Sequence, residues 1–561
     1  MAVARNNSSA DRVLLNGRIY TADSSIPWAE ALAIRDGKIA FVGADTDAKS
    51  LVGSSTNVID LKRRMVMPGI NDVHVHPLLG GRADLYECHF LPTLSLDEVL
   101  AAVRADARQA KPGAWIVGGS WGSNFTTTLS TLEALRALDE ASEGHPVLLR
   151  DDSVHNRWVN SRALELAGID SSTPDPEGGI IVRDEATRAP VGMLFESAVA
   201  AVEHAAEIAN PYSLETNVAA LARAIEILNS FGVTGLQDAA VSGGVLSAYN
   251  HLDAQGKLSA WVVGSMMAEP AGFLGHFVGD ELIDQRAKFL SAHVTPSFVK
   301  IFLDGVPMSR TSAFLEPYLP DQAHGCCFRG TTIKTVPQLA SLIAKQEDRG
   351  LGVKIHCAGD AAVRTALDAI DVVRSFKGAT TLTHQIAHAG FVDPADIRRF
   401  KDLNVVADLS PILWYPNQII DGIEQAVGGR VRQYWPNRNL LEAGVLIATG
   451  TDWPVIPNPD PWSGMEGLIT RRNPNGQFDG ALWPEQALDL PTAIAAYTFN
   501  PARAMGLGNV TGSLSVGKSA DLIVLDRNLF EIAPTEIADT KVTTTFFEGR
   551  AVYQSCGNHE E

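Results

Sequence analysis

The sequence predicts an α/β protein, namely a (β/α)8 TIM-like barrel with a small β-sandwich domain formed by both termini and a large insertion after the first barrel strand. Short runs rich in Val, Ile and Leu, broken by tight-turn signals, occupy both ends of the chain. In the middle, strand-like apolar runs alternate with helix-like segments, which is the pattern of a parallel sheet covered by helices. From about residue 90 to about residue 205 this alternation stops.

The two ends of the chain contain hairpin signals. "ALAIRDGKIAFVG" has Asp36-Gly37 between two apolar runs, and "KVTTTFFEGRAVYQ" has Glu548-Gly549 in the same position. A two-residue hairpin turn of this kind needs positive φ at both residues, which Asp-Gly tolerates well. We therefore expect residues 1–66 and 501–561 to form one sandwich, beside a barrel made from residues 67–500.

Eight strand-like runs predict the barrel. Between them lie helix-like segments such as "TVPQLASLIAKQEDRG", where Leu339, Leu342 and Ile343 have helical spacing and Gly350 is a candidate C-cap. Eight β/α units favour a closed barrel. The irregular stretch 90–205 is then an insertion, which we expect to cover the mouth of the barrel. The predicted strands are the run before His74 and residues 233–239, 260–267, 297–305, 352–360, 385–390, 404–411 and 445–452.

Composition and charge narrow the range of partners. The 561 residues are 45% apolar and 20% charged, as in ordinary globular proteins, and the net charge is −19. A surface this negative repels phosphate backbones and anionic lipid, which argues against nucleic-acid and membrane partners. Five scattered cysteines without a C-x-x-C pair predict neither a disulfide framework nor a zinc ribbon. The polar N-terminus lacks the apolar stretch of a signal peptide, so we expect a cytoplasmic protein. A homodimer is a reasonable default that no residue establishes.

Polar residues gather at the ends of the predicted strands. "GINDVHVHPLLGG" (69–81) contains His74 and His76, which point the same way because side chains alternate along a strand. Barrel enzymes carry their chemistry at the carboxyl ends of the strands. Because these side chains share that end, they predict one site. The set is His74, His76, Lys300, Asp304, His356, His388 and Asp452.

Each of these residues also has a simpler interpretation. A histidine can be a hydrogen-bonded interior residue or a helix cap, and Lys300 can be a barrel lysine paired with Asp304. Asp452 in "TGTDWPV" can be an N-cap or form an Asx turn before Pro454. The joint pattern, with four histidines, one lysine and one aspartate on the same predicted face, is what favours a metal site.

The ligand types indicate the chemistry. Neutral imidazoles and carboxylates suit zinc or a similar divalent ion. A catalytic ion lowers the pKa of bound water to about 7, so that hydroxide is available in neutral solution. Asp452 would take the proton of that water and pass it to the leaving group. A lysine carbamylated by carbon dioxide becomes a carboxylate able to bridge two ions.

The motifs as a set resemble the metal-dependent amidohydrolase superfamily, and within it the amidohydrolase 3 family and its YtcJ-like branch. The resemblance rests on "NDVHVHP", "VKIFLDGVPMSRTSAFLEPY", "KIHCAGDAAV", "IAHAGFVDPADIRRFKDLNVVADLSP" and "TGTDWPV". "GAWIVGGSW", "HPVLLRDDSVHNRWVNSRALELAGI" and the closing "FNPARAMGLGNVTGSLSVGKSADLIVLD" extend it over almost the whole chain. The branch usually has "EH" where this chain has Ala387-His388, and "SDWP" where it has Thr451 before Asp452.

The resemblance implies a role for each matching residue. His74 and His76 match the pair that binds the more buried ion, Lys300 matches a bridging carbamylated lysine, and Asp452 matches the last-strand aspartate. His356 and His388 match the ligands of the second ion. The implied cofactor is one or two divalent metal ions, expected to be zinc, and the implied reaction is hydrolysis of a non-peptide carbon–nitrogen bond. In this branch that bond belongs to N-substituted formamides.

Substrate residues are expected in the insertion and in the loops after the strands. His155 in "DDSVHNRW" matches a histidine that the family places near the site, and we expect it to polarise the scissile carbonyl. Three tryptophans around one mouth would suit an apolar or aromatic amine in a small-molecule amide. The expected wall residues are Trp121, Asp304, Arg310, Trp414 and Trp453.

Two other classes of function remain open. The same scaffold supports deaminases and cyclic-amide hydrolases, which differ in the carbon that is attacked. A catalytically silent barrel kept for assembly would have lost ligands, and none of the six expected ligands is missing from this chain.

Overall fold

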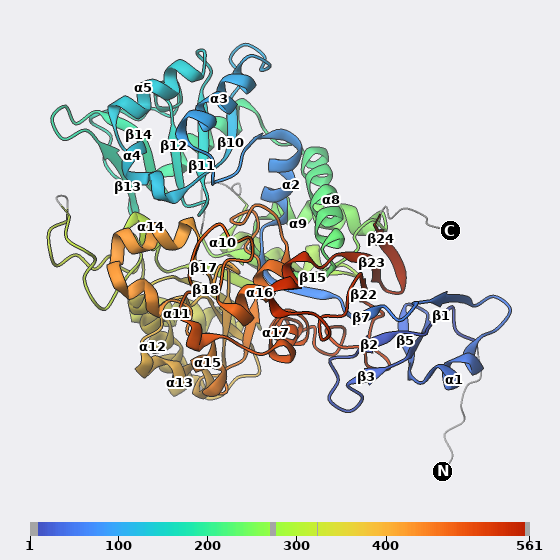
Figure 1. Ribbon diagram of the computed structural model, residues 1–561. Helices are drawn as coiled ribbons and strands as arrows, with labels where there is room; N and C mark the ends of the chain where they lie inside the picture. Colours follow the sequence, from blue (N-terminus) through green and yellow to red (C-terminus); the bar gives the residue numbers. More distant parts are fainter. Residues whose placement is uncertain (1–8, 270–276, 322–323, 556–561) are drawn as a thin grey trace.

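The computed structural model describes residues 9–269, 277–321 and 324–555. Its centre is a sheet of eight parallel strands that follow one another in chain order (Figure 1). Each of the eight predicted strands is present, so the predicted barrel is confirmed. The strands are β8 (Ile70–Val75), β15 (Val233–Val241), β16 (Trp261–Met267), β17 (Val294–Phe302), β18 (Gly352–Cys357), β19 (His384–His388), β20 (Val405–Leu409) and β21 (Ile447–Thr449).

The first and last strands of this order, β8 and β21, contact each other. Just past β21, the backbone N–H of Asp452 donates to the carbonyl of His74 at 2.7 Å, and the N–H of His76 donates to the carbonyl of Trp453 at 2.9 Å. Gly450 lies so close to His74 that an added Cβ would be 2.5 Å from the histidine's Cβ, so a side chain does not fit there. The last strand is shorter than predicted because the chain turns at Asp452, whose φ is 57°.

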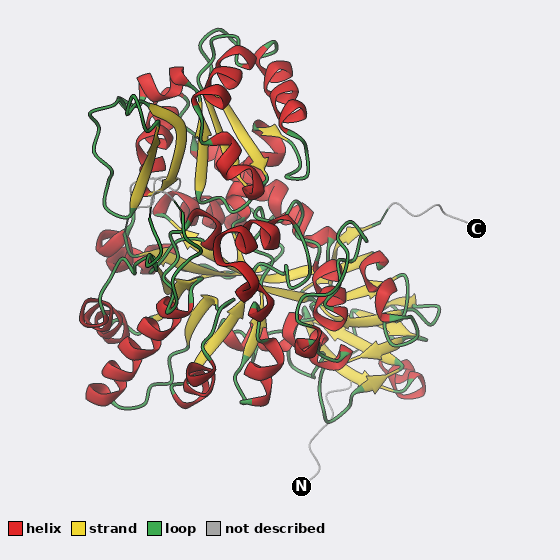
Figure 2. Ribbon diagram, turned by 60° about the vertical axis from the view of Figure 1, so that its left-hand side comes forward, coloured by secondary structure: helices red, strands yellow, loops and turns green. Residues whose placement is uncertain are grey.

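Helices surround the barrel strands, as Figure 2 shows in red around yellow. Leu339 and Ile343 are buried on the inner face of the predicted helix, and Gly350 follows its end with a φ of 73°, as expected. The helices that follow β8 and the later strands are α2 (Pro77–Tyr86), α8 (Leu214–Ser230), α9 (Gly243–Ala254), α10 (Gly279–Gln285), α11 (Val336–Asp348), α12 (Asp360–Lys377), α13 (Pro394–Asp402), α14 (Gln418–Val427), α15 (Asn437–Glu442), α16 (Pro461–Thr470), α17 (Leu490–Tyr497) and α18 (Phe499–Ala504).

The two ends of the chain form two further sheets at one side of the barrel (Figure 1). One has the order β5-β4-β1-β6 and the other the order β24-β23-β22-β7-β2-β3, so the second sheet combines strands from both ends. Both predicted hairpin turns have positive φ, 51° and 72° at Asp36-Gly37 and 48° and 71° at Glu548-Gly549. The elements are β1 (Arg12–Leu15), β2 (Arg18–Tyr20), β3 (Trp28–Ala29), β4 (Ala31–Arg35), β5 (Lys38–Gly43), α1 (Asp45–Ala48), β6 (Asn57–Asp60), β7 (Met65–Pro68), β22 (Leu522–Leu525), β23 (Val542–Phe547) and β24 (Arg550–Gln554).

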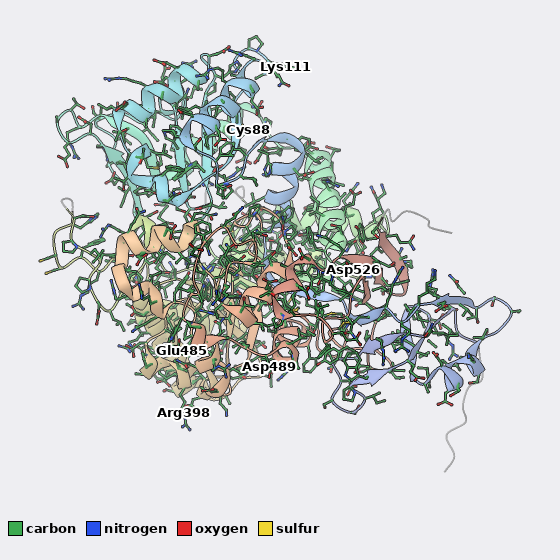
Figure 3. The ribbon with its side chains drawn as sticks, in the orientation of Figure 1. Cys88, Lys111, Arg398, Glu485, Asp489 and Asp526 are labelled. Atoms are coloured by element: carbon green, nitrogen blue, oxygen red, sulfur yellow. The ribbon has the colours of Figure 1, made fainter. Side chains whose placement is uncertain are left out.

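The insertion forms a lobe with its own sheet and its own apolar core. It is the cyan part of Figure 1, and in Figure 3 Lys111 lies at its outer end while Cys88 lies toward the barrel. The sheet has the order β13-β14-β12-β11-β10-β9. The elements are β9 (Cys88–His89), α3 (Leu96–Ala107), β10 (Ile116–Trp121), α4 (Thr126–Leu129), α5 (Leu132–Ala141), β11 (Val147–Asp151), β12 (Asn156–Val159), α6 (Ser161–Leu166), β13 (Gly179–Arg183), β14 (Pro190–Glu196) and α7 (Ala200–Ala209).

In the part of the chain that the structure describes, the helices are too short or too polar to cross a membrane.

A buried ion-pair cluster joins α11, α12 and the start of β19. Glu347 Oε1 accepts from Nε2 of His384 at 2.8 Å and from Nη1 of Arg374 at 2.6 Å. The backbone N–H of Val353 donates to Nδ1 of His384, so the ring carries its hydrogen on Nε2. Burial raises the pKa of Glu347, but the hydrogen bonds with His384 and Arg374 outweigh it and lower this pKa to about 2.

Replacing this carboxylate, in Glu347→Gln, should lower the free energy of unfolding by about 2 kcal/mol at pH 7, because two charge-assisted hydrogen bonds are weakened. A lowered pKa in the folded state gives stability that is present above the unfolded value of about 4.3 and is lost as the pH falls toward 2. Thermal unfolding at pH 7 and at pH 3 measures this. A difference in Tm between variant and wild type that does not shrink at the lower pH would contradict the assignment.

Candidate metal and catalytic site

Four histidines and one aspartate meet at the carboxyl end of the barrel. His74 lies in β8, His76 directly follows that strand, His356 lies in β18, and His388 is the last residue of β19. The ring centroids of His74 and His76 are 5.6 Å apart, those of His74 and His388 are 5.0 Å apart, and those of His356 and His388 are 4.3 Å apart. All four histidines, with Asp452, border one cavity of about 490 Å³. The structure therefore brings the predicted histidines together.

The tightest group of candidate ligands is His74, His76 and Asp452, each offering one ligand atom, with these atoms within 4.8 Å of one another. Asp452 Oδ1 is 3.6 Å from Nε2 of His74 and 3.4 Å from Nε2 of His76, and its Oδ2 is 3.8 Å from Nδ1 of His388. Burial raises the pKa of Asp452, but its hydrogen bond with His76 and its proximity to His388 outweigh burial and hold this pKa below its usual value. Asp452 is therefore a carboxylate at neutral pH.

In each of three histidines, a hydrogen bond determines which ring nitrogen is left to bind a metal. Nδ1 of His74 donates to Oδ2 of Asp408 at 2.7 Å, Nδ1 of His388 donates to the carbonyl of Ser410 at 2.8 Å, and Nδ1 of His356 donates to Oδ1 of Asp304 at 3.2 Å. Each ring therefore keeps an unprotonated Nε2 as a metal donor, the arrangement that orients most metal-binding histidines.

Burial keeps the same rings neutral. It lowers the pKa of His74 and of His356 far below the ordinary value, and it lowers the pKa of His388 to about 3. In addition, Nδ1 of His76 is buried without a hydrogen-bond partner among the described residues. Neutral imidazoles, a carboxylate and an orphaned ring nitrogen together fit a divalent metal ion.

Three charged residues that support these ligands were missed by the sequence analysis. Lys354 Nζ donates to Oδ2 of Asp408 at 2.6 Å and to the carbonyl of Val73 at 3.0 Å, so one carboxylate ties this lysine to His74. Asp72 accepts from the backbone N–H of His74 at 3.0 Å and from Oγ1 of Thr451 at 2.5 Å. Asp72 precedes His74 by two residues and Lys354 precedes His356 by two, so the alternation of side chains along a strand was the available signal.

Lys300 is 2% exposed, in β17, and borders the same cavity. Burial, and after it the charge of Lys354, lower the pKa of Lys300 to about 8. Asp304 does not neutralise it. The Asp304 carboxylate instead accepts from the backbone N–H groups of Ala358 at 2.9 Å and Gly359 at 2.9 Å, in addition to His356. Asp304 thus borders the cavity but holds the chain around His356.

His155 reaches the cavity from the insertion, between β11 and β12. Its ring centroid is 5.1 Å from that of His356, and its Nδ1 lies 2.7 Å from Oε2 of Glu196. Burial lowers the pKa of His155, but the charge of Glu196 outweighs burial and raises it. Glu196, the final residue of β14, was also missed by the sequence analysis, because its position at the end of a strand gave little signal.

The structure does not bring the other expected wall residues to this cavity. Trp121 is 1% exposed and donates to the carbonyl of Leu149 in the core of the insertion, and Trp414 is fully buried and donates to the carbonyl of Gly464. In both cases the large apolar ring is buried, and a backbone carbonyl accepts the indole N–H. Trp453 borders a neighbouring cavity instead.

Arg310 also points elsewhere. Its Nη1 donates to the carbonyl of Leu319 at 2.7 Å and its Nε lies 3.0 Å from Asp321. The walls of the cavity are mostly aliphatic rather than aromatic: Leu79, Val154, Val199, Ala200, Phe302, Ile333 and Val455. Asn156, close to His155 in sequence, is buried and donates to Asp151 and to Ser309.

Known proteins resemble this chain over almost its whole length. Residues 57–553 match the model of a family described as "Amidohydrolase family". Protein LONG AFTER FAR-RED 3 of Arabidopsis thaliana is 30% identical, over 97% of this chain and 92% of its own length. N-substituted formamide deformylase of Arthrobacter pascens is 28% identical, over 98% and 99%. Putative amidohydrolase YtcJ of Bacillus subtilis is 28% identical, over 96% and 98%. The resemblance predicted from the motifs is confirmed.

Among solved structures, an uncharacterized metal-dependent hydrolase from Pyrococcus horikoshii matches with a TM-score of 0.71 and 25% identity. The alignment covers 93% of this chain and 99% of that one. Together with the family match, this likeness supports a metal-dependent hydrolase.

Substitution of Asp408 tests whether metal binding by His74 depends on the buried carboxylate that holds its ring. Asp408→Asn should weaken metal binding about 10- to 100-fold, because the amide holds the Nδ1–H of His74 less strongly and leaves Lys354 unneutralised. Competition with a chromogenic chelator measures the affinity. A protein that folds as wild type, judged by circular dichroism, and binds metal with unchanged affinity would contradict this role.

Proposed function

Because the chain belongs to the amidohydrolase family, we propose that it is a metal-dependent hydrolase of a non-peptide carbon–nitrogen bond, in an N-substituted formamide or a related small amide. The observation that carries the proposal is the group of His74, His76 and Asp452, joined by His356 and His388 in one cavity. The relative named as N-substituted formamide deformylase, similar over nearly the full length of both chains, supports this choice of bond.

The donor set fits zinc or a similar divalent ion, which His74, His76 and Asp452 would hold. His356 and His388 would hold a second ion, and Lys300, once carbamylated, would serve as the bridging group. A bound metal would supply a Lewis acid for the substrate and lower the pKa of the attacking water. The low pKa of Lys300 supports carbamylation, because the amine that reacts with carbon dioxide is the neutral one.

Asp452 and His155 would move the protons. The Asp452 carboxylate would accept the proton of the attacking water and deliver it to the departing nitrogen, which leaves as an amine. His155 would donate from Nε2 to the carbonyl oxygen of the substrate as negative charge develops there, since its raised pKa favours the protonated ring. The aliphatic walls would exclude water from this step and hold an alkyl substituent.

A substrate screen tests the reaction. Metal-stripped protein reloaded with zinc should release formate from N-alkylformamides, and Asp452→Asn should reduce kcat/KM by about 100- to 10,000-fold. The controls are the stripped protein and wild-type protein kept with chelator. Turnover without metal would contradict the proposal, and ammonia release from amino-substituted rings without amide cleavage would indicate a deaminase instead.

The number of metal ions bound per chain tests whether Lys300 takes part in metal binding. In protein purified without chelator, we expect two equivalents in wild type and one or none in Lys300→Ala, because the bridging group is lost. Elemental analysis measures both. One equivalent that the substitution leaves unchanged would mean a single-ion site in which Lys300 is structural.

A further inference from the structure

Glu196, the last residue of β14, has an unusual backbone. Its φ is 52° and its ψ is −128°, a region that residues with a side chain rarely occupy. Its backbone N–H donates to the carbonyl of His155 at 3.1 Å, so the two residues are joined through the main chain as well as through their side chains. Such a backbone persists only where surrounding contacts hold it.

Those contacts are built around the Glu196 carboxylate. Its Oε2 lies 2.7 Å from Nδ1 of His155. Its Oε1 accepts from Oγ1 of Thr311 at 2.5 Å and from the backbone N–H of Val306 at 3.2 Å. Gly305 provides the space, because a Cβ on that residue would be 2.0 Å from Oε1. One carboxylate from the insertion thus sits in a pocket formed by the loop after β17.

Both members of this pair border the catalytic cavity. Because Glu196 accepts the hydrogen of Nδ1, Nε2 is the nitrogen of His155 left for a substrate, beside the ring of His356. Without the carboxylate the ring can rotate about χ2, and neither nitrogen is favoured toward the cavity. Because Oε1 is hydrogen-bonded to Thr311 and to Val306, the Glu196 carboxylate cannot move together with the His155 ring.

We propose that Glu196 is the positioning residue of His155. It fixes the ring so that Nε2 meets the carbonyl oxygen of the substrate, and through Thr311 and Val306 it ties this histidine to the barrel. This inference rests on the proposed function, since it assigns His155 a substrate to act on.

Two variants test it from different sides. Glu196→Gln removes the charge, and Gly305→Ala leaves the glutamate in place but takes the space of its Oε1. Each should lower kcat at least tenfold, with KM and metal content near wild type, because the metal ligands are untouched. The matched control is Glu347→Gln, which changes a buried Glu–His pair away from the cavity and should leave kcat unchanged below its unfolding temperature.

A double variant separates positioning from an independent effect. His155→Asn should lower kcat with metal retained, and Glu196→Gln added to it should lower kcat no further, because the carboxylate acts through the ring. Equal losses in both backgrounds, or a kcat for Glu196→Gln equal to wild type, would overturn the proposal. If wild type cleaves no amide, the proposed function fails by itself. Crystal structures of wild type and Gly305→Ala then decide the positioning role, and an unchanged His155 ring would overturn it.

Discussion

The hydrogen bond from the backbone N–H of Asp452 to the carbonyl of His74 is the contact on which the site depends. It joins the first strand of the barrel to the chain just past the last strand, and these two residues belong to the same group of candidate ligands. Asp72 strengthens the junction by accepting from His74 on one strand and from Thr451 after the other. Without this closure the two ligands would be separated by almost four hundred residues of chain and by an open sheet edge. The candidate metal site and the closure of the barrel therefore depend on the same contacts.

Charge inside the barrel is arranged around the same junction. Asp408 is fully buried between His74 and Lys354, and it accepts from both. A buried ion pair seldom adds net stability, since removing two charges from water costs about as much as their attraction returns. The gain here is geometric. The carboxylate holds the His74 ring in one tautomer. Burial raises the pKa of Asp408, and the charge of Lys354 opposes that rise.

Much of this could be predicted from the sequence, because the barrel strands are mainly apolar runs and several of them end in, or just before, a residue able to bind metal or move a proton. The histidines at 74, 76, 356 and 388 follow that rule. Asp72 and Lys354 were missed because a polar residue in mid-strand carries no mark of its partner, which comes from another strand. Glu196 was missed for a related reason, since its position depends on a backbone bend and on a glycine more than a hundred residues away.

The residue type of a side chain was not enough to predict which residues line the cavity. Trp121 and Trp414 were expected at the mouth because they are large and apolar, yet those same properties place them in the interior once a backbone carbonyl accepts the indole N–H. The cavity is lined instead by small aliphatic residues, which no motif distinguishes from ordinary core.

The insertion has its own apolar core, and it carries His155 and Glu196 together with the aliphatic wall residues Val154 and Val199. The barrel carries every candidate metal ligand. The barrel thus carries the candidate ligands and part of the cavity wall, and the lobe adds the rest of that wall, tied to the barrel where Glu196 binds Val306 and Thr311. Replacement of the lobe as one unit, with a carboxylate kept at the position of Glu196, would exchange one side of the cavity and His155 in a single step, while every candidate metal ligand stayed in place.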